Sequence, residues 1–194
     1  MNTPEALIYI SVLVIAISLF FIGTELTGFS TVDDTGVVNV TVSKTAGINF
    51  STDFFNFGSG AVTPGQTAII YSNGTDVGDL WEGTITPGHL TLENIGNTNV
   101  SLTLKVDKTP ESFIGATAGN IQALVTNTST HTGACIGTNT WATYQNITTV
   151  AQDACGDDFG WDGIDKIDIN FKLTIPSSAD EGEKTIEVFA EGSY

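Results

Sequence analysis

The feature that most constrains this chain is an apolar run at residues 6–23, ALIYISVLVIAISLFFIG, in which Ser11 and Ser18 are the only breaks in hydrophobicity. A run of about 18 apolar residues reaches the length at which a membrane-spanning helix is expected. Thr3 suits the N-cap of such a helix, Pro4 its first position, and Glu5 the positive end of its dipole. We therefore predict a single hydrophobic helix within residues 1–28.

The sequence before this run does not favour a cleaved signal peptide. A secretory signal has a basic segment followed by a short apolar core. Here no Lys or Arg precedes Lys44, and the apolar run is too long. The run therefore predicts either a permanent membrane anchor or a stem that later leaves the membrane.

The opening residues MNTPE, followed by the apolar run, resemble the N-terminus of a type IV pilin. In that family a basic leader is removed, and a glutamate at this position neutralises the exposed amino group of a neighbouring subunit. The resemblance implies a homo-oligomeric helical filament in which the helices pack together. The residues that it assigns to assembly are Met1, Glu5, Leu7, Ile8, Val12, Ile15, Leu19 and Ile22. The competing interpretation is a plain anchor in which Glu5 is only a first-turn acid at the membrane surface.

The charge of the chain limits its partners. It has 22 acidic residues against six lysines, no arginine, and a formal net charge of −16. Such a surface is a poor match for nucleic acid or for anionic lipid headgroups. It suits an exterior location, and residues 29–194 are numerous enough for one well-buried domain.

Beyond the apolar run, apolar and polar residues alternate. The clearest example is residues 167–175, where Ile167, Ile169, Phe171 and Leu173 fall on one side of a predicted strand. The Phe-rich stretch 48–57 is expected to pack in the core, and residues 58–65 to form a loop. Further strands are predicted at 38–43, 66–72, 80–86, 90–94, 100–106, 121–126, 141–149 and 184–190, the last as a closing hairpin strand.

These strands predict a mainly β fold, with one N-terminal hydrophobic α-helix (1–28) followed by an antiparallel β-sandwich head (29–194). The phrase LTLENIGNTNVSLTLKV resembles a strand pair of immunoglobulin-like β-sandwiches. Bacterial type IV pilins continue the N-terminal helix into the head, whereas here strands begin soon after Gly28. The chain is therefore more similar to an archaeal pilin or archaellin.

Two kinds of covalent modification are predicted on an exported head. Cys135 and Cys155 are the only cysteines, and one disulfide is the simplest use of such a pair. Six N-x-Ser/Thr sequons are candidate acceptors of N-linked glycans. They lie at Asn39, Asn49, Asn73, Asn99, Asn127 and Asn146, and Asn73 is the best candidate because a turn is expected there.

The sequence offers no support for catalysis or for a cofactor. It contains no nucleophile elbow, no zinc-protease helix motif and no phosphate-binding glycine loop. The acidic run Asp153, Asp157, Asp158, Asp162, Asp165 and Asp168 does not match the helix–loop–helix calcium pattern, so a solvated acidic loop is expected instead of a metal site.

The expected function is a structural subunit of an extracellular type IV pilus-like filament, either an archaeal pilus or an archaellum. The subunit would be held in the membrane by residues 1–28 before it polymerises. The alternative is a monomeric, membrane-anchored extracellular β-sandwich that serves as a binding or scaffold protein. A third possibility, an anchored hydrolase, has no motif in its favour.

Overall fold

The structure, a computed structural model, describes residues 40–41, 43–130, 133–135, 140–155, 158–163 and 165–194. Within them, Ser43–Tyr194 form one compact unit. The predicted hydrophobic helix and all eight assembly residues lie outside the described part of the chain. No helix among the described residues is both long enough and apolar enough to cross a bilayer.

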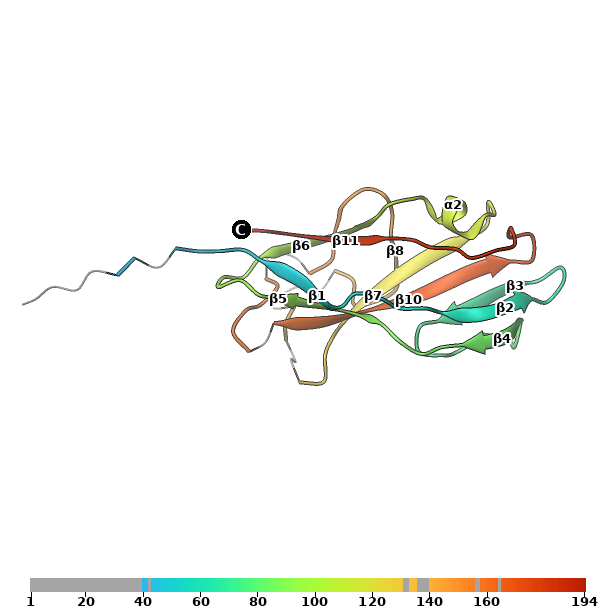
Figure 1. Cartoon of the computed structure of the whole chain (residues 1–194), viewed down its shortest axis with the longest axis horizontal. Coiled ribbons are helices and arrows are strands. Elements are labelled where there is room, and N and C mark those ends of the chain that lie inside the picture. The colour runs from blue at the N-terminus through green and yellow to red at the C-terminus, as the bar shows by residue number, and fades with distance from the viewer. Residues whose placement is uncertain (1–39, 42, 131–132, 136–139, 156–157, 164) are drawn as a thin grey trace, which may run out of the picture. The chain divides into compact units, whose positions relative to one another are not determined.

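The described part is mainly β, as predicted, with eleven strands and one short helix (Figure 1). The strands are β1 (Ile48–Thr52), β2 (Gly58–Val62), β3 (Thr67–Tyr71), β4 (Trp81–Ile85), β5 (Leu90–Asn94), β6 (Ser101–Val106), β7 (Asn120–Asn127), β8 (Gln145–Asn146), β9 (Gln152–Asp153), β10 (Lys166–Pro176) and β11 (Val188–Ser193). The helix is α2 (Pro110–Ile114).

Among the described residues, every strand pair is antiparallel, and the strands form three sheets. The largest has six strands in the order β1-β5-β10-β7-β8, and β3 also pairs with β10. A three-stranded sheet has the order β11-β6-β9, and β2 pairs with β4 in a separate ribbon. This ribbon lies at the end of the unit opposite the C-terminus (Figure 1).

Strand β10 is the centre of the largest sheet, and its alternation confirms the prediction for residues 167–175. Ile167, Ile169, Phe171 and Leu173 are all buried, whereas the residues between them are half-buried. Strand β7 pairs with almost the whole length of β10 on one side. On the other side β5 pairs with the first part of β10 and β3 with the last part.

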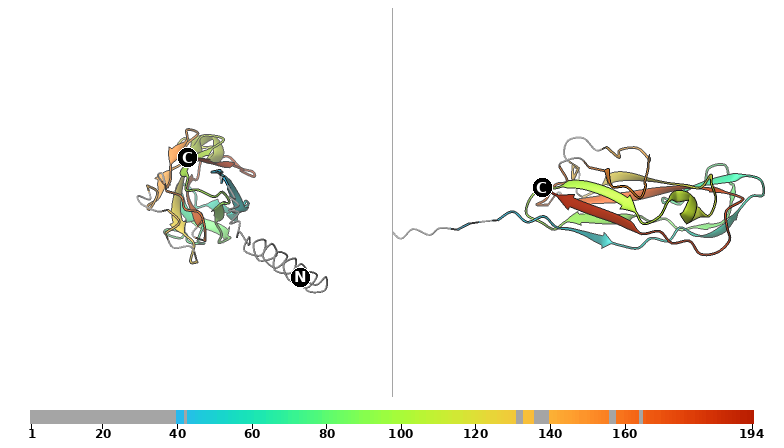
Figure 2. Two further views of the ribbon diagram at one scale, coloured as in Figure 1. Left: turned by 90° about the vertical axis from the view of Figure 1, so that its left-hand side faces the viewer. Right: turned by 90° about the horizontal axis from the view of Figure 1, so that it is seen from above.

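One hydrophobic core joins the inner face of the six-stranded sheet to that of the three-stranded sheet. Leu102 and Leu104 of β6 are fully buried, as are Leu92 of β5 and Ile167 of β10. Figure 2 shows β6 and β11 side by side in their own layer. The Cys135–Cys155 disulfide is part of this core.

The interpretation of residues 90–106 as a strand pair is wrong, because β5 and β6 belong to different sheets. The connection between them passes from one sheet to the other and is held by Asn94, which is 2 % exposed. Its amide nitrogen donates to the carbonyls of Thr98 at 3.0 Å and Phe159 at 3.1 Å. Both strands alternate in the same way, so the pattern alone did not reveal that they lie in opposite layers.

Three other predictions need correction. Residues 58–65, expected as a loop, contain strand β2, whose Gly and Ser residues carry little strand signal. The final strand lies a few residues later than predicted and pairs with β6, so it does not form a hairpin with β10. In the predicted strand at 38–43, the described residues Val40, Thr41 and Ser43 are not in a strand.

The residues at its two ends explain why helix α2 forms, although the sequence analysis did not predict this helix. Thr109 caps it by accepting a hydrogen bond from the Ser112 amide, Pro110 takes the first turn, and Gly115 ends it in the left-handed conformation. The helix buries Phe113 and Ile114 against the core.

Candidate binding site

Polar side chains cover the outward face of the six-stranded sheet. Because β10 buries every second residue, Asp168, Asn170 and Lys172 lie on its other face. The register places Asp168 between Thr91 of β5 and Thr126 of β7. A row of polar residues therefore crosses three strands at this level of the sheet.

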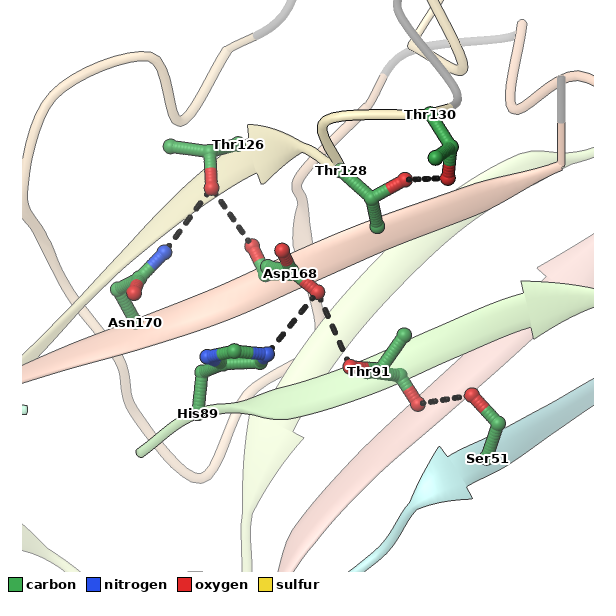
Figure 3. A network of polar contacts seen from close by, with 8 residues as sticks. All are labelled: Ser51, His89, Thr91, Thr126, Thr128, Thr130, Asp168 and Asn170. Atoms are coloured by element: carbon green, nitrogen blue, oxygen red, sulfur yellow. Dashed lines mark hydrogen bonds and ion pairs between the residues drawn. The ribbon is translucent and has the colours of Figure 1, made fainter. Parts of the chain in front are cut away.

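Asp168 is the centre of a hydrogen-bonded network in this row (Figure 3). The hydroxyl of Thr91 donates to Asp168 Oδ1 at 3.0 Å, and His89 Nε2 lies 3.4 Å from the same oxygen. The side chain of His89 is 45 % exposed, whereas that of Asp168 is only 20 % exposed. The Asp168 carboxylate is therefore the less accessible partner, and it orients the more accessible imidazole of His89.

Further hydrogen bonds extend the network to both neighbouring strands. Thr126 donates its hydroxyl to the Asp168 carbonyl at 3.5 Å and accepts from the Asn170 amide at 3.0 Å. On the other side, the hydroxyl of Ser51 in β1 donates to the Thr91 carbonyl at 3.4 Å. The network thus joins β1, β5, β10 and β7 (Figure 3).

The segment that carries His89 is fixed by Ser72, a fully buried polar residue. The Gly88 amide donates to the Ser72 carbonyl at 2.7 Å. Ser72 in turn forms two hydrogen bonds with the backbone of Phe171 in β10. These bonds anchor the chain one residue before His89 to the central strand.

A shallow groove of about 380 Å³ begins at His89 and lies between two connections, residues 53–57 and 86–89. The amide of Thr86 donates to the Phe57 carbonyl at 2.9 Å and ties the connections together. The groove is lined by Thr52, Phe54, Phe55, Asn56, Thr86, Pro87, Gly88 and His89.

The Phe-rich stretch divides its side chains between the core and this groove. Phe55 and Phe57, whose rings lie 4.6 Å apart, pack against the core as expected. Phe55 lies so close to Gly88 that a Cβ at that position would come within 2.5 Å of the ring. Phe54 differs from the expectation, because it is 75 % exposed.

Two tyrosines lie close together near the six-stranded sheet. The rings of Tyr71, which ends β3, and Tyr144, which precedes β8, meet edge to face with centroids 5.4 Å apart. Burial, and to a lesser degree the neighbouring Tyr71, raises the pKa of the Tyr144 hydroxyl above its ordinary value. Both effects disfavour the phenolate.

Thr91, His89 and Asp168 are not arranged as a nucleophilic triad. In a nucleophilic triad the hydroxyl donates to the imidazole. Here the Thr91 hydroxyl donates to the carboxylate, on the same oxygen that faces His89. The Asp168–His89 pair therefore orients an imidazole without activating a hydroxyl nucleophile.

The remaining candidate residues that the structure describes do not belong to the His89–Asp168 network. Cys135 and Cys155 form the predicted disulfide, with Cα atoms 5.3 Å apart. Among the described sequon asparagines, Asn49, Asn73, Asn127 and Asn146 are exposed, Asn99 is half-buried, and Asn39 lies outside the described residues. Asn73 occupies the expected turn, where its Oδ1 accepts from the Thr75 amide at 3.1 Å.

The described carboxylates of the acidic run are spread over separate elements. Asp153 belongs to β9 and Asp168 to β10. Among the described residues no group of three or more His, Cys, Asp and Glu side chains could hold a metal ion.

Sequence reasoning did not identify the His89–Asp168 network. Its residues are far apart in the chain, and only the register of β5, β10 and β7 brings them together. The available signal was the alternation around Asp168, which placed that carboxylate on the outward face.

These observations define an antiparallel β domain with one disulfide, a polar outer sheet face and an adjoining groove. The chain matches no protein-family model, no curated protein and no solved structure.

Proposed function

We propose that this protein is a structural subunit of an extracellular type IV pilus-like filament, most like archaeal pilins and archaellins. The observation that carries the proposal is the glutamate-led apolar run at residues 6–23, joined to a mainly β, disulfide-bearing unit. In this proposal residues 1–28 form one hydrophobic helix, and residues 29–194 form an immunoglobulin-like sandwich head.

Assembly would bury the apolar helices against one another in the filament centre. Each square ångström of apolar surface removed from water contributes about 25 cal/mol, so long helices supply a large association energy. Met1 and Glu5 would set the register, because the amino group of one subunit neutralises the carboxylate of the next. Before assembly the same helix would hold the subunit in the membrane.

The short helix α2 supports the expected start of the N-terminal helix. Thr109-Pro110-Glu111 is the same tripeptide as Thr3-Pro4-Glu5. At residues 109–111 it begins a helix, with Thr109 as the cap and Glu111 in the first turn. The chemistry that we infer for the chain's opening residues is therefore used elsewhere in the same molecule.

The β unit supports an exported head. The disulfide suits an oxidising compartment. The crossing between β5 and β6, which places consecutive strands in different layers, is typical of immunoglobulin-like sandwiches. A monomeric, membrane-anchored binding or scaffold protein is the second candidate, and the groove beside His89 favours it.

Shearing of cells that express the chain, followed by electron microscopy of the supernatant, tests the proposal. Helical filaments that contain this chain are the expected result, and Glu5→Ala should abolish them while the subunit stays in the membrane fraction. Glu25→Ala, outside the apolar run, is the matched control. Recovery of the unaltered chain only as detergent-extracted monomers would support the second candidate.

A further inference from the structure

We propose that the groove beside His89 binds an uncharged glycan. Phe54 would pack against the apolar face of a sugar ring, and His89 would form hydrogen bonds with the hydroxyl groups of that sugar. This inference goes beyond filament assembly and does not depend on it. It rests on an exposed aromatic ring, an oriented imidazole and a lining without charged carboxylate or lysine groups.

The exposure of Phe54 is the first step. A phenyl ring that is 75 % exposed gains little from folding, although its neighbours Phe55 and Phe57 pack against the core. Aromatic side chains are enriched at binding interfaces, where they contribute a large apolar contact area. The ring gives the groove one apolar surface that suits the C–H face of a pyranose.

The polar groups around the ring are the second step. Asp168 holds His89 through Nε2, and no other hydrogen bond to the imidazole occurs among the described residues. The Oδ1 atom of Asn56 accepts from the Gly58 amide at 2.8 Å, which fixes that side chain while its NH2 group has no partner in the described part of the chain. Two oriented polar groups therefore line the same groove as Phe54, as small-ligand sites require.

The charge of the groove decides between ligand classes. The chain as a whole carries a net charge of −16, yet the groove lining contains no Asp, Glu or Lys. An anionic polymer would be repelled by the surrounding protein and would find no Lys or Arg in the lining. An uncharged ligand with hydroxyl groups and one apolar face matches a lining that combines Phe and Pro with Thr, Asn and His and contains no Asp, Glu, Lys or Arg.

The shape of the groove favours a chain of sugars over a free monosaccharide. Its volume of about 380 Å³ is near the lower limit of small-molecule sites, about 300 Å³. The groove is shallow and open to solvent, so it would not enclose a bound ring, and further sugar units could extend from that ring.

Affinity electrophoresis of the full chain tests this inference, in a detergent that has no sugar headgroup. Native gels would contain mannan, xylan or a soluble β-glucan, with alginate as the anionic probe. We expect retardation by at least one neutral glycan and none by alginate. Phe54→Ala should weaken the binding by about tenfold, the loss of about one aromatic contact.

Tyr194→Ala is the matched control, because that aromatic side chain is 73 % exposed and is not part of the groove lining. Circular dichroism of each variant establishes that the β unit is folded. No retardation by any neutral glycan would overturn the inference, as would equal binding by Phe54→Ala and the unaltered chain. If alginate retards the chain at least as strongly as the neutral glycans do, the claim that the ligand is uncharged is wrong.

Discussion

Ser72 and Phe171 are joined by two hydrogen bonds at the point where the central strand changes partners. The Ser72 amide donates to the Phe171 carbonyl at 2.8 Å, and the Phe171 amide donates to Ser72 Oγ at 3.0 Å. Strand β5 pairs with β10 before this point, and β3 pairs with it afterwards. The hydroxyl of Ser72 thus serves as the acceptor that a strand carbonyl would otherwise supply.

Replacement of Ser72 by Ala should therefore destabilise the protein. It leaves the Phe171 amide buried without its acceptor, at a cost of about 1–3 kcal/mol. The urea midpoint of the full chain, followed by tryptophan fluorescence, measures the loss. Ser51→Ala is the control, because that exposed hydroxyl makes one long bond of 3.4 Å, and it should change stability by less than about 0.5 kcal/mol. Equal effects of the two substitutions would contradict the role given to Ser72.

Asn94 holds the crossing from one sheet to the other, and we expect Asn94→Ala to cost about 1–3 kcal/mol through its unpaired buried groups. Besides the two bonds that it donates, its Oδ1 accepts from the Gly96 amide at 3.0 Å. Asn94→Asp should be at least as harmful, because it places a carboxylate against the carbonyls of Thr98 and Phe159.

Thermal unfolding by circular dichroism distinguishes these variants from Asn49→Ala, which alters an exposed asparagine of β1. The proposed role of Asn94 fails if Asn94→Asp is as stable as the parent, since that result would mean that its amide donors contribute nothing.

The strands themselves were largely predictable from the sequence, whereas their pairing was not. Alternation identifies β10 because Ile167, Ile169, Phe171 and Leu173 contact one core. Strand β2 was missed because its Gly and Ser residues pack little and alternate weakly. The partners of β5 and β6 depend on how the Asn94 connection turns, and the apolar pattern of either strand is the same in both arrangements.

The candidate site was less predictable than the strands. The exposure of Phe54 depends on the path of residues 53–57, and Phe55, next to it in the sequence, is half-buried. Likewise, nothing near His89 in the sequence indicates a carboxylate partner. Asp168 lies 79 residues later in the chain, and the pairing of β10 with β5 brings it next to His89. The path of a connection determines the first feature, and long-range strand pairing determines the second.

Removal of the disulfide should lower stability by about 3 kcal/mol in the chain-entropy model for a loop of this length. The bridge closes a segment in which Cys135 and Cys155 are 20 residues apart and both are buried. The Cys135→Ser/Cys155→Ser variant, compared with the parent by urea denaturation, measures the effect. A reducing agent should lower the midpoint of the parent alone, and an unchanged parent midpoint would contradict the prediction.

The raised pKa of Tyr144 predicts a loss of stability at high pH. Burial, and then Tyr71, favours the protonated phenol in the folded state, so the folded protein binds more protons than the unfolded chain above pH ~10, the usual tyrosine pKa. Stability therefore falls as pH rises from the unfolded toward the folded pKa. Tyr144→Phe should reduce that fall and remove a component above pH ~10 from the ultraviolet titration of tyrosine. Tyr194→Phe, at an exposed site, should leave both unchanged, and a Tyr144→Phe variant with the parent's pH profile would show that Tyr144 ionises normally.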